Sequence, residues 1–248
     1  MRWRLLMDGE NSATYNMAKD LALLEKCQVP VLRLYSWSPS AVSIGRFQSL
    51  NDEVDVQKCK EKKVSVVRRV TGGGAVFHDA EVTYSVCIPV QENLVSTDIT
   101  KSYKEICGAV MRGLKILGVN PTYEPINDIC ISGKKVSGCA QTRKNGILLQ
   151  HGTILMKVDP EKMFQMLRVP QEKMRDKIVK SVKERVTALS DMLQREVMKA
   201  EVIDALVKGF GEWFEVSWEK SDLTDEEREV LEKRKREVFE NEEWTRLR

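Results

Sequence analysis

Two short turns in the middle of the chain constrain the fold more than any other feature. Ser132-Gly133 and Asn145-Gly146 separate three runs with strand character, NDICIS, KKVSGCAQT and GILLQHGTILMKV. Asn-Gly is a favoured pair for a type I′ hairpin turn, so we expect the three runs to pair as antiparallel neighbours. Helical patterns lie on both sides of them along the chain. The combination predicts an α+β fold and argues against a doubly wound parallel sheet.

The rest of the chain divides into further strands and helices. A helix is expected to begin near Asn11 or Ser12, and a second is expected over about 100–117, with Gly118 as its stop. Four more runs are expected to be strands: VLRLYSW, AVSIGRF, VSVVRRV and EVTYSVCIPV. From about Pro160 the pattern is helical and highly charged. We expect one domain over 1–248, with a helical C-terminal portion over about 160–248.

Composition excludes several classes of protein. Forty Lys and Arg stand against 37 Asp and Glu, and this near balance gives no support for nucleic-acid binding. The six cysteines form no CxxC pair and the chain has two histidines, so a metal cluster and a disulfide framework are both disfavoured. No apolar run is long enough to cross a membrane or to act as a signal peptide. We therefore expect a cytoplasmic protein with reduced thiols.

The stretch RRVTGGGAVFHD, residues 68–79, concentrates residues that can bind a ligand. It is neither GxxxxGK[ST] nor GxGxxG, so it supports neither a Walker-type nucleotide site nor a Rossmann fingerprint. Gly72, Gly73 and Gly74 would still let backbone amides approach an anion closely, beside the basic Arg69. The alternative is a tight loop between strands with no other role.

Other candidate residues lie in the hairpin region. His78 in VFHD and His151 in LLQHGT each lie beside a turn-forming or acidic residue, which suggests one converging site, although a single histidine is usually structural. Alternation places Lys134 and Lys135 on opposite faces of a strand, and a lysine that points inward needs an anion as partner. The alternative is an ordinary lysine next to a turn. Asn127 and Asp128 would hold a metal ion or a purine, or would cap the start of a strand.

Together these segments resemble the lipoate–protein ligase A family. RRVTGGGAVFHD, the Asn127-Asp128 pair, GKKVSGCAQT and HGTIL match the family in order and spacing, and GRFQ and SVKERVTAL extend the likeness over nearly the whole chain. The resemblance implies the biotin–lipoate ligase-like, class II synthetase-like fold, a mixed and largely antiparallel sheet flanked by helices. It implies the catalytic domain without the C-terminal accessory domain of the best-known ligases.

The resemblance also assigns expected roles. Lys135 would be the catalytic residue at the reacting carboxyl, and Arg69 would contact the adenylate. The acyl group and nucleotide would be bound by these residues together with Gly72, Gly73, Gly74, Ala75, His78, Asn127, Asp128, Gly138 and His151, with Asp128 as a ligand for Mg²⁺. ATP, Mg²⁺ and lipoate are the expected cofactors and substrate. The expected partners are lipoyl-domain acceptors, namely 2-oxoacid dehydrogenase E2 and the glycine cleavage H protein, with a separate small accessory subunit in some members.

Two enzymatic activities occur in this superfamily. Octanoyl transferases use a cysteine placed upstream of the lysine that matches Lys135, and Asn120 occupies that neighbourhood here. We therefore predict an ATP-dependent, AMP-forming lipoate–protein ligase that acts through a lipoyl-adenylate. The alternative is an octanoyl or lipoyl transferase that acts through a cysteine thioester without ATP. Biotin ligation and a non-catalytic scaffold agree less well with the glycine stretch and with the retained lysine.

Overall fold

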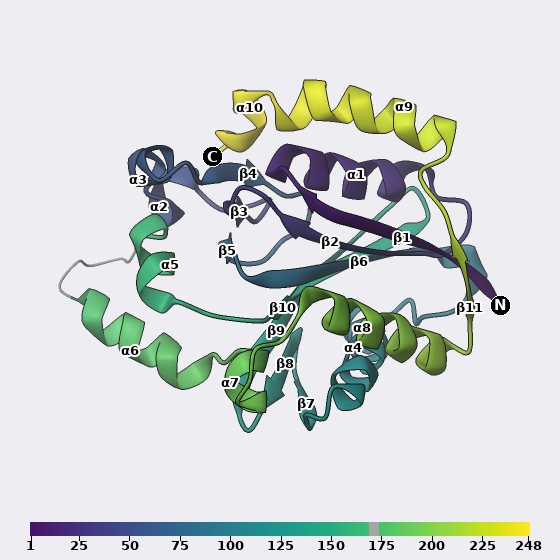
Figure 1. The fold of residues 1–248 in the computed structure, drawn as a ribbon. Coiled ribbons are helices and arrows are strands. Elements are labelled where there is room, and N and C mark those ends of the chain that lie inside the picture. The colour runs from purple at the N-terminus through teal and green to yellow at the C-terminus, as the bar shows by residue number, and fades with distance from the viewer. Residues whose placement is uncertain (169–173) are drawn as a thin grey trace.

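A computed structural model describes residues 1–168 and 174–248 of the protein. Its centre is an eight-stranded sheet in the order β11-β1-β2-β6-β10-β9-β8-β7, with a three-stranded sheet in the order β4-β3-β5 beside it (Figure 1). In the large sheet β1 runs parallel to β2 and β11, and the remaining pairs are antiparallel. The prediction of an α+β fold with a mixed, largely antiparallel sheet is confirmed.

The strands have the following bounds: β1 Arg2–Asn11, β2 Val31–Trp37, β3 Ala41–Ile44, β4 Ser65–Arg68, β5 Val76–His78, β6 Glu81–Pro89, β7 Pro121–Glu124, β8 Asp128–Ile131, β9 Lys134–Lys144, β10 Ile147–Leu155 and β11 Ser217–Lys220. The helices are α1 Ala13–Lys26, α2 Leu50–Glu53, α3 Val56–Glu61, α4 Ile99–Ile116, α5 Pro160–Met166, α6 Arg175–Arg185, α7 Leu189–Leu193, α8 Lys199–Phe214, α9 Asp225–Arg234 and α10 Glu242–Thr245. Short 3₁₀ and π segments are η1 Val90–Glu92 and η3 Lys235–Phe239.

Helices cover both faces of the large sheet. α4 and α8 pack together on one face, and α1 and α9 lie on the other (Figure 1). α4 places Ile106, Val110 and Leu114 on one buried stripe, which is the 3.6-residue spacing of an amphipathic helix. α1 begins after Ser12, whose side chain accepts a hydrogen bond from the Tyr15 backbone amide. Both helices agree with their sequence predictions.

The predicted hairpins are present. β8, β9 and β10 are consecutive antiparallel neighbours, and Ser132, Gly133, Asn145 and Gly146 all have positive φ, as the tight turns between them require. The consequence for the site is that Lys135, Gly138 and His151 lie on adjacent strands.

Four strands were not predicted, namely β1, β5, β7 and β11. β1 pairs in parallel with β2, and β11 adds to β1 at the sheet edge, within the region predicted to be helical. Both β7 and β11 are edge strands of four residues and carry no clear alternation of apolar residues. The part of the predicted helical region at 169–173 lies outside the described residues. Among the helices that the structure describes, none is long and apolar enough to span a membrane.

Candidate active site

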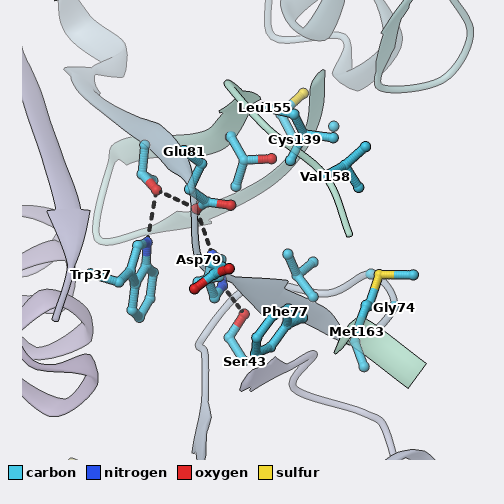
Figure 2. Close-up of a pocket in the computed structure, with 18 of the residues that line it drawn as sticks. Trp37, Ser43, Gly74, Phe77, Asp79, Glu81, Cys139, Leu155, Val158 and Met163 are labelled. Carbon is cyan, nitrogen blue, oxygen red and sulfur yellow. Dashed lines mark hydrogen bonds and ion pairs between the residues drawn. The ribbon is translucent and has the colours of Figure 1, made fainter. Parts of the chain in front are cut away.

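A cavity of about 360 Å³ lies where the two sheets meet the segment that carries α5 and α6. That volume is within the range of pockets that hold small molecules. Its walls come from β2, β3, β5, β6, β9 and β10, together with the glycine loop between β4 and β5 (residues 69–75). Figure 2 shows Trp37, Glu81 and Ser43 on one side of this cavity and the apolar Val158 and Met163 on another.

Most residues selected from the sequence line this one cavity. They are Arg69, Gly73, Gly74, Ala75, His78, Asn127, Lys135, Gly138 and His151. Gly72 and Asp128 do not line it; Gly72 lines a neighbouring groove, and Asp128 contacts the cavity through Lys135. The two histidines therefore do converge on one cavity, whereas the roles expected for these residues stay predictions.

Lys135 lines the cavity at a partly exposed position. Its side chain is 39% exposed, and its Nζ lies 2.7 Å from Asp128 Oδ1. The contact lacks hydrogen-bond geometry and is an ion pair. A Cβ at Gly138 would come within 2.7 Å of Lys135 Nζ, so the glycine leaves the space in which the lysine lies. The Thr187 amide donates to the Lys135 carbonyl at 2.8 Å, which ties β9 to the SVKERVTAL segment.

Arg69 holds the glycine loop through hydrogen bonds to its carbonyl groups. The guanidinium, which is 5% exposed, donates to the carbonyls of Gly72 and Gly74 at 2.7 and 2.8 Å, and to the Ser43 carbonyl at 3.0 Å. Burial lowers the pKa of Arg69 to about 10. Gly73 has φ +93°, a conformation that favours glycine. The closest packing in this region is at Gly45, where a Cβ would lie 2.0 Å from the Gly73 carbonyl oxygen.

His151 belongs to a buried network in which every acceptor is used. Its Nδ1 lies 2.9 Å from Asp20 Oδ2, and its Nε2 lies 2.7 Å from Thr71 Oγ1. The other oxygen of Asp20 accepts from Arg33 at 2.7 Å. Burial alone would raise the pKa of the Asp20 carboxyl, but the Arg33 guanidinium and the hydrogen bond from His151 outweigh it and lower that pKa. The network joins α1 and β10 to the start of the glycine loop.

His78 belongs to a second network, drawn in Figure 2. His78 Nδ1 lies 2.7 Å from Glu81 Oε1, and His78 Nε2 lies 2.7 Å from Ser43 Oγ. Thr83 also donates to Glu81 Oε1, at 2.9 Å, and Trp37 Nε1 donates to Thr83 at 2.8 Å. Trp37 stacks on the His78 ring with centroids 3.9 Å apart. Glu81 Oε2 has no hydrogen-bond partner among the described residues.

The six cysteines are all buried and unpaired in the structure. Cys139 lines the cavity, and its Sγ lies 3.7 Å from Cys107 Sγ. Burial, reinforced by Cys107, raises the pKa of the Cys139 thiol well above its usual value. Burial likewise raises the pKa of Cys130. Both thiols are therefore protonated at neutral pH, which is unfavourable for a nucleophile.

Sequence reasoning missed several polar residues of the cavity wall, among them Trp37, Ser43, Glu81 and Thr83. The alternation in β6 placed Val82 and Tyr84 on one face, so Glu81 and Thr83 face the opposite way. That alternation could have drawn attention to an acidic residue in a strand that is buried along its whole length.

Around Asp128, the residues that the structure describes do not make a metal site. Asp128 pairs with Lys135, and the described residues contain no group of three or more His, Cys, Asp or Glu side chains that could hold a metal ion. The prediction that Asp128 binds Mg²⁺ thus has no support from its surroundings.

Comparison with known proteins adds to this geometry. Residues 12–211 match a family model described as "Lipoyl protein ligase A/B catalytic domain". The chain is 38% identical to an octanoyltransferase LipM of Kyrpidia tusciae over 93% of each chain, and 36% identical to an octanoyltransferase LipM of Carboxydothermus hydrogenoformans over 98% and 97%. Its fold is similar to a bi-partite lipoate protein ligase of Thermoplasma acidophilum, with a TM-score of 0.91, 32% identity and coverage of 100% and 98%.

These relatives correct the activity predicted from the sequence. Curated relatives that match nearly the whole chain are named octanoyltransferases, which contradicts the prediction of an ATP-dependent, AMP-forming ligase and agrees better with the transferase alternative. The predicted use of ATP and Mg²⁺ loses its support for the same reason. The prediction was wrong because it took one cysteine position as the mark of a transferase. One fold serves both activities, so the fold does not decide between them.

Proposed function

We propose, since this chain belongs to the lipoyl protein ligase A/B catalytic domain family, that it is an acyltransferase of protein lipoylation. It moves a medium-chain acyl group, octanoyl in the first instance, from a thioester carrier to a lysine amine of an acceptor protein, without ATP. The observation that carries the proposal is a largely apolar cavity with a lysine at its rim, in a chain whose curated relatives are named octanoyltransferases.

The exposure of the cavity residues gives the acyl chain a direction. Lys135 is 39% exposed, whereas His78 and Glu81 are 4% and 1% exposed. Carrier and acceptor are both macromolecules, so the thioester carbonyl must lie at the accessible end. The acyl tail then extends inward, past Leu155 and Met163, toward Trp37.

Transfer needs no ionised thiol of the enzyme. The acceptor ε-amine attacks the thioester carbonyl carbon, a C–N bond forms, and the carbonyl oxygen gains negative charge beside the Lys135 ammonium. The C–S bond then breaks and the carrier leaves as a thiol. Asp128, paired with Lys135, accepts the proton that the amine loses and passes it to the leaving sulfur. A positioned cation that stabilises a developing oxyanion is worth about 10²–10³ in rate.

We further propose lipoyl domains as acceptors. The Thermoplasma protein of similar fold is described together with its E2 lipoyl domain. A lysine at the tip of such a small domain could reach the rim occupied by Lys135 without entering the buried part of the cavity.

The test compares two donors. Purified protein is mixed with an unmodified lipoyl domain and either octanoyl-loaded acyl carrier protein without ATP, or free octanoate with Mg-ATP. We expect an octanoyl mass gain on the acceptor in the first mixture. Gain in the second mixture alone, with release of AMP, would show that the proposed reaction is wrong.

A further inference from the structure

A groove of about 580 Å³ lies next to the cavity and has no part in the reaction proposed above. The two hollows share the glycine loop, because Gly72 lines the groove and the next residue, Gly73, lines the cavity. They also share β9, where Ala140 lines the cavity and Gln141 lines the groove. The groove is therefore a neighbour of the cavity along two separate segments of the chain.

The groove combines apolar and basic side chains. Its apolar residues are Leu21, Leu24, Phe47, Val70, Val238 and Trp244. Its charged residues are four cations and one carboxylate, namely Arg46, Arg143, Lys144, Arg234 and Glu25. Glu25 accepts from Lys144 at 2.7 Å and from Arg234 at 2.9 Å. Glu237, which does not line the groove, lies 3.5 Å from Arg234. These two carboxylates do not balance the four cations, so the groove attracts a negatively charged surface.

The segment GRFQ, residues 45–48, presents two side chains to this groove. Arg68 holds the segment in place by donating to three of its carbonyl groups, at 2.7 to 3.1 Å. Phe47 is nevertheless 65% exposed. The Arg46 guanidinium lies over the Trp244 ring, 5.1 Å from its centroid, and has no ion pair with a carboxylate among the described residues. Aromatic rings and guanidinium groups are enriched at protein interfaces, so the segment offers a partner both kinds of contact.

Distances along β9 decide which partner the groove suits. A Cβ at Gly138 would lie 2.7 Å from Lys135 Nζ, so the reacting carbonyl group is expected beside Gly138. The groove extends along β9 from Gln141 to Lys144, which at about 3.3 Å per residue lies about 10–20 Å from that carbonyl. A lysine side chain extends about 6 Å from its Cα, since it has five bonds of about 1.5 Å. The acceptor must therefore sit at the rim near Lys135, whereas a carrier can sit in the groove if its thiol ends a longer flexible arm.

We propose that the groove, together with Arg46 and Phe47, docks the thioester carrier, and that this carrier is an acidic protein with its acyl group on a flexible arm. The inference rests on the proposed function for the thioester donor, and it gives donor and acceptor separate places on the enzyme. Attraction between opposite charges should strengthen the encounter and fade with salt, because the Debye length falls from about 10 Å at 0.1 M to about 3 Å at 1 M.

The experiment measures binding and needs no turnover. Octanoyl-loaded acyl carrier protein and an unmodified lipoyl domain, each with a fluorescent label, are titrated with the enzyme and followed by anisotropy at low and at high salt. Arg46→Glu should weaken binding of the carrier about tenfold at low salt and much less at high salt, because the variant repels an acidic surface. The affinity of this variant for the lipoyl domain should equal that of the wild type.

Two further variants control for charge and for folding. Arg112→Glu reverses the same charge at a half-exposed position on α4, which packs on the opposite face of the large sheet from α1, and should leave carrier affinity unchanged. Phe47→Ala should weaken the carrier about threefold at both salt concentrations, because the exposed ring makes an apolar contact. Melting curves establish that the variants fold.

Absence of carrier binding, a carrier affinity that does not change with salt, or equal effects of Arg46→Glu and Arg112→Glu would overturn the inference. Equal weakening of the lipoyl domain by Arg46→Glu would assign the groove to the acceptor and overturn it too. The outcome is separable from that of the proposed function. Carrier binding at the groove without octanoyl transfer would leave the docking surface in place and remove the proposed reaction. Transfer with no loss of carrier affinity in Arg46→Glu would do the reverse.

Discussion

Each of the two histidines contacts a buried carboxylate, but the two carboxylates differ in how many of their oxygens have a hydrogen-bond partner. At His151 the chain of contacts runs from Thr71 to Asp20, and both oxygens of Asp20 are used by Arg33, Tyr35 and His151 itself. At His78 the chain runs from Arg69 to Glu81, and one carboxylate oxygen has no partner among the described residues. The first network is closed, whereas the second leaves one buried carboxylate oxygen without a hydrogen bond.

The glycine loop and the rim of the cavity at Lys135 also differ in whether their polar groups are fully used. Arg69 uses its donors on carbonyl groups of the protein, so the loop is held without a ligand. Lys135 is half-exposed, and its ion pair is with a partly exposed carboxylate. Lys135 therefore lies at the accessible end of the cavity, and Glu81 lies at its buried end.

The largest effect should come from breaking the closed network. Asp20→Ala leaves the fully buried Arg33 without one of its two carboxylate partners and His151 without its anchor. We expect a loss of about 3–5 kcal/mol in the free energy of unfolding, measured by denaturant titration. A loss below about 1 kcal/mol would mean that the network is not structural.

The pH dependence of the free energy of unfolding tests the role of the same carboxylate, Asp20. The pKa of Asp20 is lower in the folded protein than in the unfolded chain, so its ionised form contributes stability above the unfolded value of about 3.9. That contribution is lost as the pH falls through the lower, folded-state pKa. Asp20→Asn should therefore show a shallower loss of stability between about pH 5 and pH 2 than the wild type.

The next largest effect is expected on the rate of acyl transfer. Lys135→Ala should lower the rate of acyl transfer by about 10²-fold, because the developing oxyanion loses its cation. Stability should change little, since a partly exposed ion pair contributes about 1 kcal/mol or less. Lys134→Ala is the matched control, and steady-state kinetics measure both. Equal losses in the two variants would contradict the role given to Lys135.

A smaller effect should follow from a change in the glycine loop. Gly73→Ala places a side chain at φ +93° and within 2.9 Å of Arg69 Nη2, and should cost about 1–2 kcal/mol of stability. Gly72 has neither feature, because a Cβ added there would meet no atom within 4 Å and its φ is not positive, so Gly72→Ala is the control. Thermal melts of the Gly73→Ala and Gly72→Ala variants measure the difference. Similar melting temperatures would show that Arg69 does not fix the loop.

The smallest effect on transfer is expected when the Cys139 thiol, which lines the cavity, is removed. Cys139→Ala should keep transfer within about threefold of the wild type, since burial keeps this thiol protonated. Cys107→Ala controls for the loss of a buried sulfur. A stable octanoyl adduct on Cys139, seen by mass spectrometry of the intact protein, would restore the cysteine mechanism.

Local patterns predicted the hairpins and the convergence of most site residues, because positive-φ turns and strand alternation act over a few residues. They did not predict the partner of His151, because Asp20 is 131 positions away and is brought close only by the packing of α1 on the sheet. Arg69 lines the cavity as expected and donates to Gly72, Gly74 and Ser43, so its expected contact with a ligand stays a prediction. Which polar atoms remain free depends on the whole set of contacts, and residue spacing does not contain that information.

Release of the carrier thiol tests the account most directly. Octanoyl-loaded carrier protein is mixed with excess enzyme in the absence of ATP, with and without the lipoyl-domain acceptor, and free thiol is followed by a chromogenic reagent. Direct transfer predicts thiol release only when the acceptor is present, in a one-to-one ratio with the octanoyl amide formed. A burst of thiol without acceptor, or no release in either mixture until ATP is added, would contradict the account.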